Sequence, residues 1–399
     1  MRLYGAIMRL VERYFAVYRG LPPAMWWLAG SQFVWNCGQT GLAFMAVYLA
    51  QQYGTSATDI GIVLGAAGAG RLVAAVPSGW LADRVDNRRL MIVIMAVQAL
   101  AFVPMPFINS IAALSATAFL IGLCDQGVRP PGMACALFLC PPEDRMRGYG
   151  LNRLATNAGL GAGTSLGGLI YAGWADGIFW VNAIACAAST LMLLPMPKVH
   201  PRGNQPKSKD TSSSVWRDGN YLLFCAVLML GATIFMQFRS TLPTDLVTRQ
   251  GLSPATFGLL IAVNCIAVAV FEMPIIAALR RFRSENVATV GVLLVGIAYG
   301  SLALWGGFPA AVLWMILWTL SEMALLPASM GIAQKRAEKG RPGETMAIYS
   351  LVFSVASTVG PIFGGFILDH GGSTLLWGGS FVVCLVSALA VHRVGRKVS

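Results

Sequence analysis

The sequence predicts an all-α integral membrane protein in which twelve transmembrane helices form two pseudo-symmetric bundles of six. Composition is the first observation: 56% of the 399 residues are hydrophobic, only 12% are charged, and the mean hydropathy is +0.65. Because soluble domains carry about 25% charged residues, lipid must solvate much of this chain. The second observation is that apolar stretches of about 20 residues, long enough to span a bilayer as helix, recur throughout.

An internal repeat is the third observation. Shifting the chain by 197 positions places Asp125 on Glu322 and keeps the two copies aligned without a gap from residue 61 to residue 168. The other matched pairs are Gly61 with Gly258, Pro77 with Pro274, Pro130 with Pro327, Met133 with Met330, and Gly163, Gly167 and Gly168 with Gly360, Gly364 and Gly365. Two copies that run in one direction, each with an acid in an apolar segment, are typical of a transporter with two rocking halves.

The twelve segments are expected to be helices, because the alternating pattern of an outer-membrane barrel is absent. The first half supplies residues 24–50, 59–82, 89–108, 111–139, 149–173 and 178–196. The second half supplies residues 219–242, 256–279, 287–306, 310–334, 346–369 and 374–392. The connections on the outer face are short, which leaves no room for an external domain.

The polar stretches complete the domain organisation. Residues 1–20 carry four arginines among apolar residues and no cleavage site, so they are expected to form an amphipathic helix on the cytoplasmic surface. Residues 21–196 and 219–393 are the two predicted six-helix bundles. The polar, low-complexity segment 197–218 is the predicted cytoplasmic linker, and residues 394–399 are the predicted cytoplasmic tail.

The net charge of +12 reflects topology. With the N-terminus inside, 24 of the 29 lysines and arginines fall in the termini and cytoplasmic loops, and only Arg249 falls in an outer connection. This bias predicts a multi-pass plasma membrane protein, of a bacterial inner membrane, with both termini in the cytoplasm and basic loops near anionic lipid. Because the basic residues follow the loops, nucleic-acid binding is not expected.

Enzymatic and metal chemistry are not expected either. His200, His370 and His392 lie in loops or near span ends, and the eight cysteines fall in spans without CxxC spacing. There is no Gly-rich phosphate-binding loop, so ATP is not the expected energy source. We expect no cofactor other than a proton as coupling ion, a small-molecule substrate as partner, and a monomer.

The connection between the second and third spans carries a motif. Residues 79–89 read GWLADRVDNRR, which resembles the signature loop G-x-L-a-D-r-x-G-r-k of the major facilitator superfamily. Asp86 and Asn87 depart from it, since the family usually has glycine and a basic residue there. With the twelve spans and the central linker, the resemblance covers essentially the whole chain. It implies a latch on the cytoplasmic gate formed by Gly79, Asp83, Arg84 and Arg88; a merely solvated basic loop is the alternative.

Glycines of the fifth and eleventh spans resemble the G-P-x-x-G-G element of the drug:proton antiporter branch of this superfamily. The second copy has Gly360, Pro361, Gly364 and Gly365, whereas the first has Gly163, Gly167 and Gly168 with Thr164 in place of proline. Glycines four residues apart let helices approach closely, and the resemblance implies that these helices lie along the seam between the halves. Static packing is the alternative reading.

Charged residues inside the spans each need a partner, a proton or water. Arg71 and Asp125 lie within about one helical turn in depth, so an ion pair is predicted. Arg129 follows Asp125 by four residues and can compete for it. Arg239 is expected to snorkel to the outer interface.

A second ion pair is predicted across the seam. The resemblance implies that the fifth and eighth helices touch, and Arg153 and Glu272 lie towards the cytoplasmic ends of these helices. We therefore expect an Arg153–Glu272 bridge that shifts when the halves rock. Separate contacts of the two residues with lipid headgroups are the alternative.

Glu322 is predicted to carry the proton. The repeat places Val268 and Leu326 where the first half has its two arginines, so Glu322 lacks both candidate partners. A buried carboxylate without a cation is costly to ionise and is expected to hold a proton until the cavity opens to water. Asp125 is the second predicted titrating site. The alternative is a protonated Glu322 held by interhelical hydrogen bonds without a role in transport.

Five polar or aromatic residues are candidates for the substrate cavity, which the resemblance implies is lined by the first, fourth, seventh and tenth helices: Asn36, Gln39, Gln237, Trp314 and Trp318. Interhelical hydrogen bonding is the alternative for the polar ones. The predicted function is proton-coupled export of small amphipathic or drug-like molecules by alternating access. Two alternatives stay open: proton-coupled uptake or facilitated diffusion of a polar solute, and a non-transporting sensor on the same fold.

Overall fold

The computed structural model describes residues 18–199, 215–338 and 342–398. The predicted surface helix at residues 1–20 and most of the predicted linker therefore lie outside the described residues.

The first half is helical. Its α-helices are α2 (Pro23–Cys37), α3 (Thr40–Tyr53), α4 (Ala57–Ala82), α5 (Asn87–Phe102), α6 (Ile111–Phe138), α7 (Arg145–Gly173) and α8 (Gly177–Leu193). Two short 3-10 turns, η1 (Met105–Phe107) and η2 (Pro142–Asp144), lie in its connections.

The second half begins with the turn η3 (Val215–Arg217) and is built from α9 (Gly219–Phe235), α11 (Pro254–Leu279), α12 (Ser284–Leu304), α13 (Gly307–Glu338) and α14 (Pro342–Val398). After α9 the chain tightens into the 3-10 turn η4 (Met236–Arg239), one turn of α-helix α10 (Thr241–Thr244) and the π-helical turn η5 (Asp245–Arg249).

The described helices account for twelve membrane crossings, as predicted. Eight of them are by themselves long and apolar enough to cross a bilayer. One of these, α14, bends at Gly372, whose φ of 73° suits a residue without Cβ, and so crosses twice. The remaining crossings are α7, α8, and α2 with α3, which are separated by a break at Gly38 and Gln39.

The repeat is visible in the helix boundaries. The bounds of α4, moved by 197 residues, are those of α11, and α5 and α12 start at equivalent positions. The N-caps repeat as well, because the Ser56 side chain accepts from the Asp59 amide and the Ser253 side chain accepts from the Thr256 amide. Each half thus starts its second crossing with the same local chemistry.

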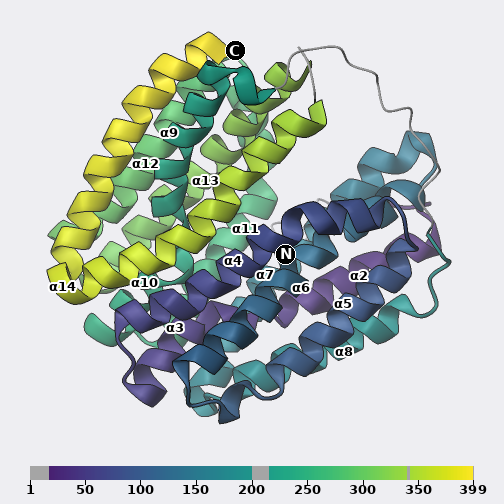
Figure 1. Ribbon diagram of the computed structural model, residues 1–399, viewed down its shortest axis with the longest axis horizontal. Coiled ribbons are helices and arrows are strands. Elements are labelled where there is room, and N and C mark those ends of the chain that lie inside the picture. Colours follow the sequence, from purple (N-terminus) through teal and green to yellow (C-terminus); the bar gives the residue numbers. More distant parts are fainter. Residues whose placement is uncertain (1–17, 200–214, 339–341, 399) are drawn as a thin grey trace, which may run out of the picture.

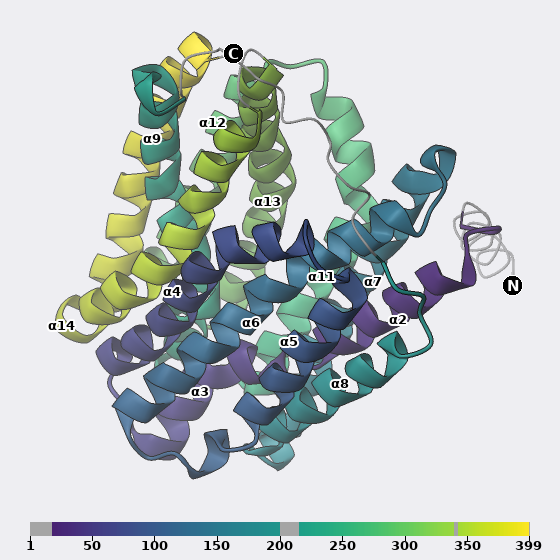
Figure 2. The ribbon, with the colours of Figure 1, turned by 45° about the vertical axis from the view of Figure 1, so that its right-hand side comes forward.

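The two halves lie side by side (Figures 1 and 2). We call the side where α8 ends and α9 begins the linker side, and the side where α3 ends and α4 begins the far side. The halves meet where α4 packs on α14 and α7 packs on α11. A Cβ on Gly61 would lie 2.3 Å from the Pro361 carbonyl oxygen, and one on Gly258 would lie 2.5 Å from that of Thr164. Glycine thus permits both contacts.

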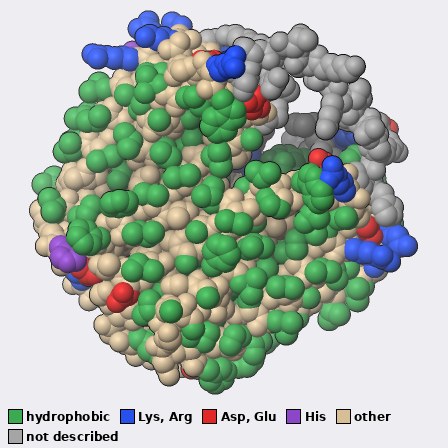
Figure 3. Space-filling view, in the orientation of Figure 1, with side chains coloured by type: hydrophobic (Ala, Val, Ile, Leu, Met, Phe, Trp, Pro, Cys, Tyr) green, Lys and Arg blue, Asp and Glu red, His purple; other side chains and the backbone are tan. Residues whose placement is uncertain are grey.

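The outer surface suits a lipid environment. Hydrophobic side chains cover the face in Figure 3, and charged side chains gather near its ends. Large apolar residues such as Val76, Leu100 and Leu304 are 71%, 72% and 76% exposed. So much exposed apolar surface would be unstable in water, which agrees with a multi-pass membrane protein.

Candidate functional site

A cavity of about 450 Å³ lies between the halves and is lined by helices of both. This volume is in the range of small-molecule sites. The molecular surface is hollowed between the halves on the linker side (Figure 3). The charged lining residues of the cavity are Arg71, Asp125, Arg129, Arg239 and Glu322.

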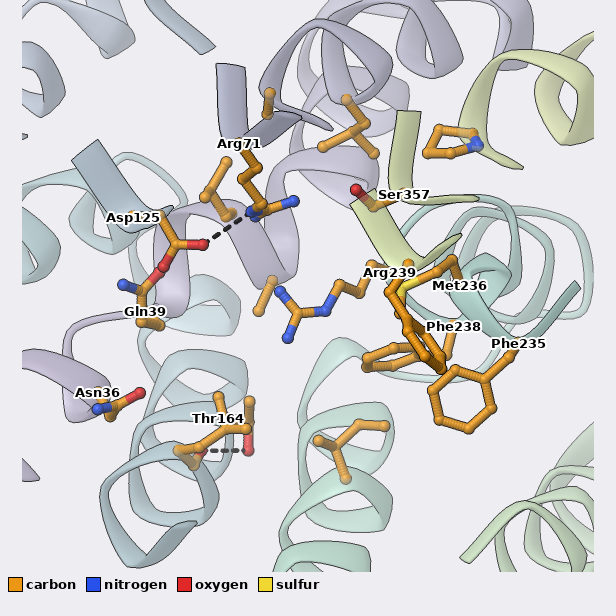
Figure 4. Close-up of a pocket in the computed structure, with 18 of the residues that line it drawn as sticks. Asn36, Gln39, Arg71, Asp125, Thr164, Phe235, Met236, Phe238, Arg239 and Ser357 are labelled. Carbon is orange, nitrogen blue, oxygen red and sulfur yellow. Dashed lines mark hydrogen bonds and ion pairs between the residues drawn. The ribbon is translucent and has the colours of Figure 1, made fainter. Parts of the chain in front are cut away.

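Asp125 is paired with arginine. Arg71 on α4 donates from Nε to Asp125 Oδ2 on α6 over 2.7 Å (Figure 4). Arg129 Nη2 lies 3.6 Å from the same oxygen. The Asp125 side chain is only 4% exposed. The predicted pair is present, and Arg129 joins it instead of displacing Arg71. Two guanidinium groups share one carboxylate, so this cluster carries a formal charge of +1.

Glu322 has a different environment. Its Oε2 accepts a hydrogen bond of 3.1 Å from Asn264 Nδ2, which also lies 3.0 Å from Thr319 Oγ1. Among the residues that the structure describes, Glu322 forms no ion pair, in agreement with the loss of both arginines in the repeat. Comparing the copies missed Asn264. Its position in the sequence could have indicated it, because Asn264 lies one helical turn before Val268 on the face of α11 that meets α13.

Arg239 does not snorkel, contrary to our expectation. It ends η4, and its guanidinium extends into the middle of the cavity (Figure 4). The 3-10 turn changes the direction of side chains relative to a continuous α-helix, which sequence periodicity could not reveal. The Arg239 side chain lies beside the Phe238 ring, with Cζ 5.1 Å from the ring centroid.

Aromatic rings form one wall of the cavity. The Trp318 ring centroid lies 4.9 Å from that of Phe235 and 4.6 Å from that of Phe238. Trp314 is not a lining residue: it is fully buried and stacks behind Trp318 at 5.3 Å. The prediction that Trp314 lines the cavity was wrong. Trp314 lies four residues before Trp318 on α13, one helical turn farther along the helix, where α12 and α14 cover it.

The polar candidates divide in the same way. Asn36 and Gln39 line the cavity at the break between α2 and α3, where Asn36 donates to the Gln32 carbonyl over 2.7 Å. Gln39 Nε2 is buried without a hydrogen-bond partner. Gln237 is instead directed towards α14, where its side chain donates to the Gly360 carbonyl over 3.2 Å. Its prediction as a lining residue is corrected, because η4 rotates it away from the cavity and brings Arg239 in.

Among the described residues, the hydrogen bonds, ion pairs and ring contacts of the motif loop all lie within the first half. Asp83 and Arg84 are exposed, and Arg84 lies over the Trp80 ring at 4.0 Å. Arg88 donates to the carbonyls of Leu193 and Leu194, within its own half. A Cβ on Gly79 would meet no atom within 4 Å. The described loop residues therefore form no latch with the second half in this structure.

Asp86, which departs from the family motif, has a structural role. Its carboxylate caps α5 by accepting from the Arg88 amide over 3.1 Å and also accepts from the Val199 amide over 3.0 Å. It thereby ties the loop to the chain that follows α8.

On the far side, Asp369 near the bend of α14 links the two halves. Its carboxylate accepts from the Ala57 amide over 3.1 Å and from the Thr58 amide and hydroxyl over 2.6 and 2.7 Å. Arg249 Nη2 lies 3.7 Å from the same carboxylate. An acid of one half therefore caps a helix of the other, which sequence analysis did not anticipate.

The predicted bridge between α7 and α11 is present, since Arg153 Nη2 donates to Glu272 Oε1. The glycines predicted for the seam divide into two sets. Gly168 and Gly365 meet backbone of the opposite half, at Pro254 and Ala57. Gly163, Gly167, Gly360 and Gly364 face helices of their own half, because residues a few positions apart on a helix point in different directions. The backbone of Pro361 meets α4.

The major facilitator superfamily model matches residues 28–248 and 223–396 of the chain. A relative from Bacillus subtilis (strain 168), the uncharacterised MFS-type transporter YqjV, is 23% identical over 368 residues, which is 89% of each chain. The multidrug resistance protein MdtH of Citrobacter koseri is 23% identical over 336 residues, 82% of each chain.

Solved structures agree with the fold. A crystal structure of the peptide transporter POT in complex with sulfate superimposes with a TM-score of 0.82 over 94% of this chain and 95% of that chain. Its identity of 14% supports the architecture alone.

Proposed function

The chain belongs to the major facilitator superfamily, and we propose that it is a proton-coupled secondary transporter of small amphipathic molecules that works by alternating access. As a member it is a multi-pass membrane transporter and not an enzyme. The observation that carries the proton coupling is the difference between two repeat-related acids on one cavity. Asp125 is held by two arginines, whereas Glu322 is held by an uncharged amide.

This difference assigns separate roles to the two acids. Asp125 is stabilised as a carboxylate by Arg71 and Arg129, so it keeps its charge through most of the cycle. Glu322 lines the cavity without a cation, and a charge in such a place is costly unless water reaches it. Glu322 therefore takes up a proton in one facing state and releases it in the other, with Asp125 as a second site.

The orientation follows from the basic loops. We propose that the linker side is cytoplasmic, because Lys and Arg concentrate there. The structure then corresponds to a state that faces the cytoplasm, in which Asp369 holds the far side closed and the motif loop is disengaged. Gly79, Asp83, Arg84 and Arg88 would form the latch only when the linker side closes.

We propose export as the direction of transport. The glycine element in α14 resembles that of drug:proton antiporters, and a multidrug resistance protein is among the relatives. Export by exchange requires that proton and substrate compete for the cavity.

Proton-coupled uptake is a second candidate, and one observation favours it. The cavity is lined by three arginines and two acids. A proton on Glu322 makes the cavity more positive, so it strengthens the binding of an anion instead of displacing it. Proton and anion then move together, down the inward proton gradient.

The test uses purified protein in liposomes with an internal pH dye and a compound panel. We expect a transported compound to move protons with wild type, and Glu322→Gln to abolish proton movement while leaving compound exchange intact. Asp59→Asn is the matched control, since this acid bonds to Ser56 of its own half and does not line the cavity. If Glu322→Gln moves protons as well as wild type does, Glu322 is not the proton carrier. Loss in Asp125→Asn with Glu322→Gln unaffected transfers the role to Asp125.

A further inference from the structure

Arg239 is a cation without a partner in the centre of the cavity. It forms no hydrogen bond and no ion pair with any residue that the structure describes. Its guanidinium lies beside the Phe238 ring, and the carboxylates of Asp125 and Glu322 act on it only through space, beyond ion-pair distance. Its position is set by η4, which follows α9 and places the side chain between the two halves (Figure 4). A charge held at membrane depth is costly, so an unpaired guanidinium there calls for a partner from outside the chain.

The acids of the cavity do not supply this partner. Asp125 is already shared by Arg71 at 2.7 Å and Arg129 at 3.6 Å. Glu322 accepts from Asn264 and makes no ion pair with an arginine among the described residues. With both acids ionised, the lining keeps one formal positive charge in excess, and with Glu322 protonated it keeps two.

The surroundings of Arg239 are aromatic. The rings of Phe235, Phe238 and Trp318 pack on one another with centroids 4.6–5.9 Å apart, next to the guanidinium. Such a wall offers a flat apolar surface for the body of a ligand. An arginine fork beside it matches the two oxygens of a carboxylate.

We propose that the substrate is an amphipathic organic acid, bound with its carboxylate on Arg239 and its apolar or aromatic body against Phe238 and Trp318. This inference rests on the proposed function, whose site it shares, and it specifies the substrate class. A neutral or cationic analogue of the same shape leaves Arg239 unpaired and binds more weakly.

The test is a binding measurement on purified full-length protein in lipid nanodiscs with three probes that share one body: 4-phenylbutyrate, 4-phenylbutyramide and 4-phenylbutylamine. We expect the acid to bind wild type about tenfold or more tighter than the amide, since charge-assisted hydrogen bonds differ from neutral ones by this order. Arg239→Gln should bring the affinity for the acid to that for the amide. Arg239→Lys should retain part of the preference, because it keeps the charge and loses the planar fork.

Arg281→Gln is the matched control. This arginine also lies beside a phenylalanine, Phe282, at 4.9 Å, but it is not a residue of the cavity lining. Equal binding of acid and amide to wild type, binding of none of the three probes, or a preference that survives in Arg239→Gln overturns the proposal. If Arg239→Gln does not fold, the proposal is still tested by comparing acid and amide binding to the wild-type protein and to Arg239→Lys.

Binding is measured without a proton gradient, so the two proposals fail separately. If the acid binds more tightly in a way that depends on Arg239 but no protons move in liposomes, the proposed proton coupling is refuted and the proposed substrate class stands. If a neutral or cationic compound drives proton movement and the acid shows no binding preference, the proposed substrate class alone is refuted.

Discussion

Asp369→Ala is expected to shift the protein from the state closed on the far side towards one that is open there. The substitution removes the hydrogen bonds that link α14 to the first turn of α4 at Ala57 and Thr58. Because these bonds join opposite halves, they exist only while the far side is closed.

The magnitude follows from the type of contact. Loss of a capping side chain costs about 0.5–2 kcal/mol, and hydrogen bonds to a charged group contribute about 1.5–3 kcal/mol. The Asp369 side chain is 22% exposed, so solvent weakens these bonds only in part. The pair with Arg249, at 3.7 Å and with the Arg249 side chain 39% exposed, adds at most about 1 kcal/mol. A net effect of about 2 kcal/mol changes the ratio of closed to open states by about 30-fold.

The assay is a distance distribution between spin labels on the far side, at Tyr53 in the first half and Trp305 in the second. Both side chains are exposed, and the eight free cysteines are replaced beforehand. We expect a longer distance to gain population in Asp369→Ala, and a smaller gain in Asp369→Asn, which keeps an acceptor oxygen. Asp59→Asn is the matched control, because Asp59 lies in the first turn of the same helix and bonds to Ser56 of its own half. Identical distributions in wild type and Asp369→Ala refute the reasoning.

Two further predictions concern the seam and the linker side. Gly365→Ala should populate the same long distance between the spin labels, because the new Cβ would lie 2.0 Å from the Ala57 carbonyl oxygen, and overpacking of this kind costs about 1–3 kcal/mol. Gly378→Ala is the control and should leave the distances unchanged, because its Cβ would meet no atom within 4 Å. Equal distance distributions in the two variants contradict the prediction. Burial raises the pKa of Asp218, whereas its hydrogen bonds with Arg336 and the Tyr221 amide lower this pKa. The hydrogen bonds together outweigh burial, so the pKa of Asp218 in the folded protein lies below its usual value. A lowered pKa stabilises the fold above about pH 4, the unfolded pKa, and this stabilisation is lost as pH falls through the folded pKa. Asp218→Ala should therefore lower the unfolding temperature at pH 7, and the difference from wild type should shrink progressively as the pH falls below about 4. A difference that does not change with pH contradicts the assignment.

Much of the fold could be predicted because membrane helices obey local rules. Hydropathy over about 20 residues locates a crossing, so the boundaries of α4, α6 and α11 differ from the predicted spans by at most a few residues. The ion pair of Arg71 and Asp125 follows from depth alone, since each residue lies 14 positions after the first residue of its helix, 71 − 57 in α4 and 125 − 111 in α6.

The candidate site was predicted less completely, and the errors for Arg239 and Gln237 share one physical cause. Arg239 and Gln237 lie in η4, where the chain leaves regular α-helical geometry and side chains change direction. Asn264 was missed because comparison of the two copies looked only at positions equivalent to the arginines. A new partner can occupy any position on the facing helix that reaches the same atom.

The sequence by itself determined the class of machine: a membrane protein of two repeated halves, with a family motif and one acid in each copy. These features depend on composition, period and alignment, which are properties of the linear chain. Only the tertiary structure decided which charges meet. It placed Arg239 in the cavity without a partner, gave Asn264 to Glu322, and set Asp369 on the end of α4. Each of these depends on the relative position of helices from distant segments or opposite halves, and no local rule specifies it.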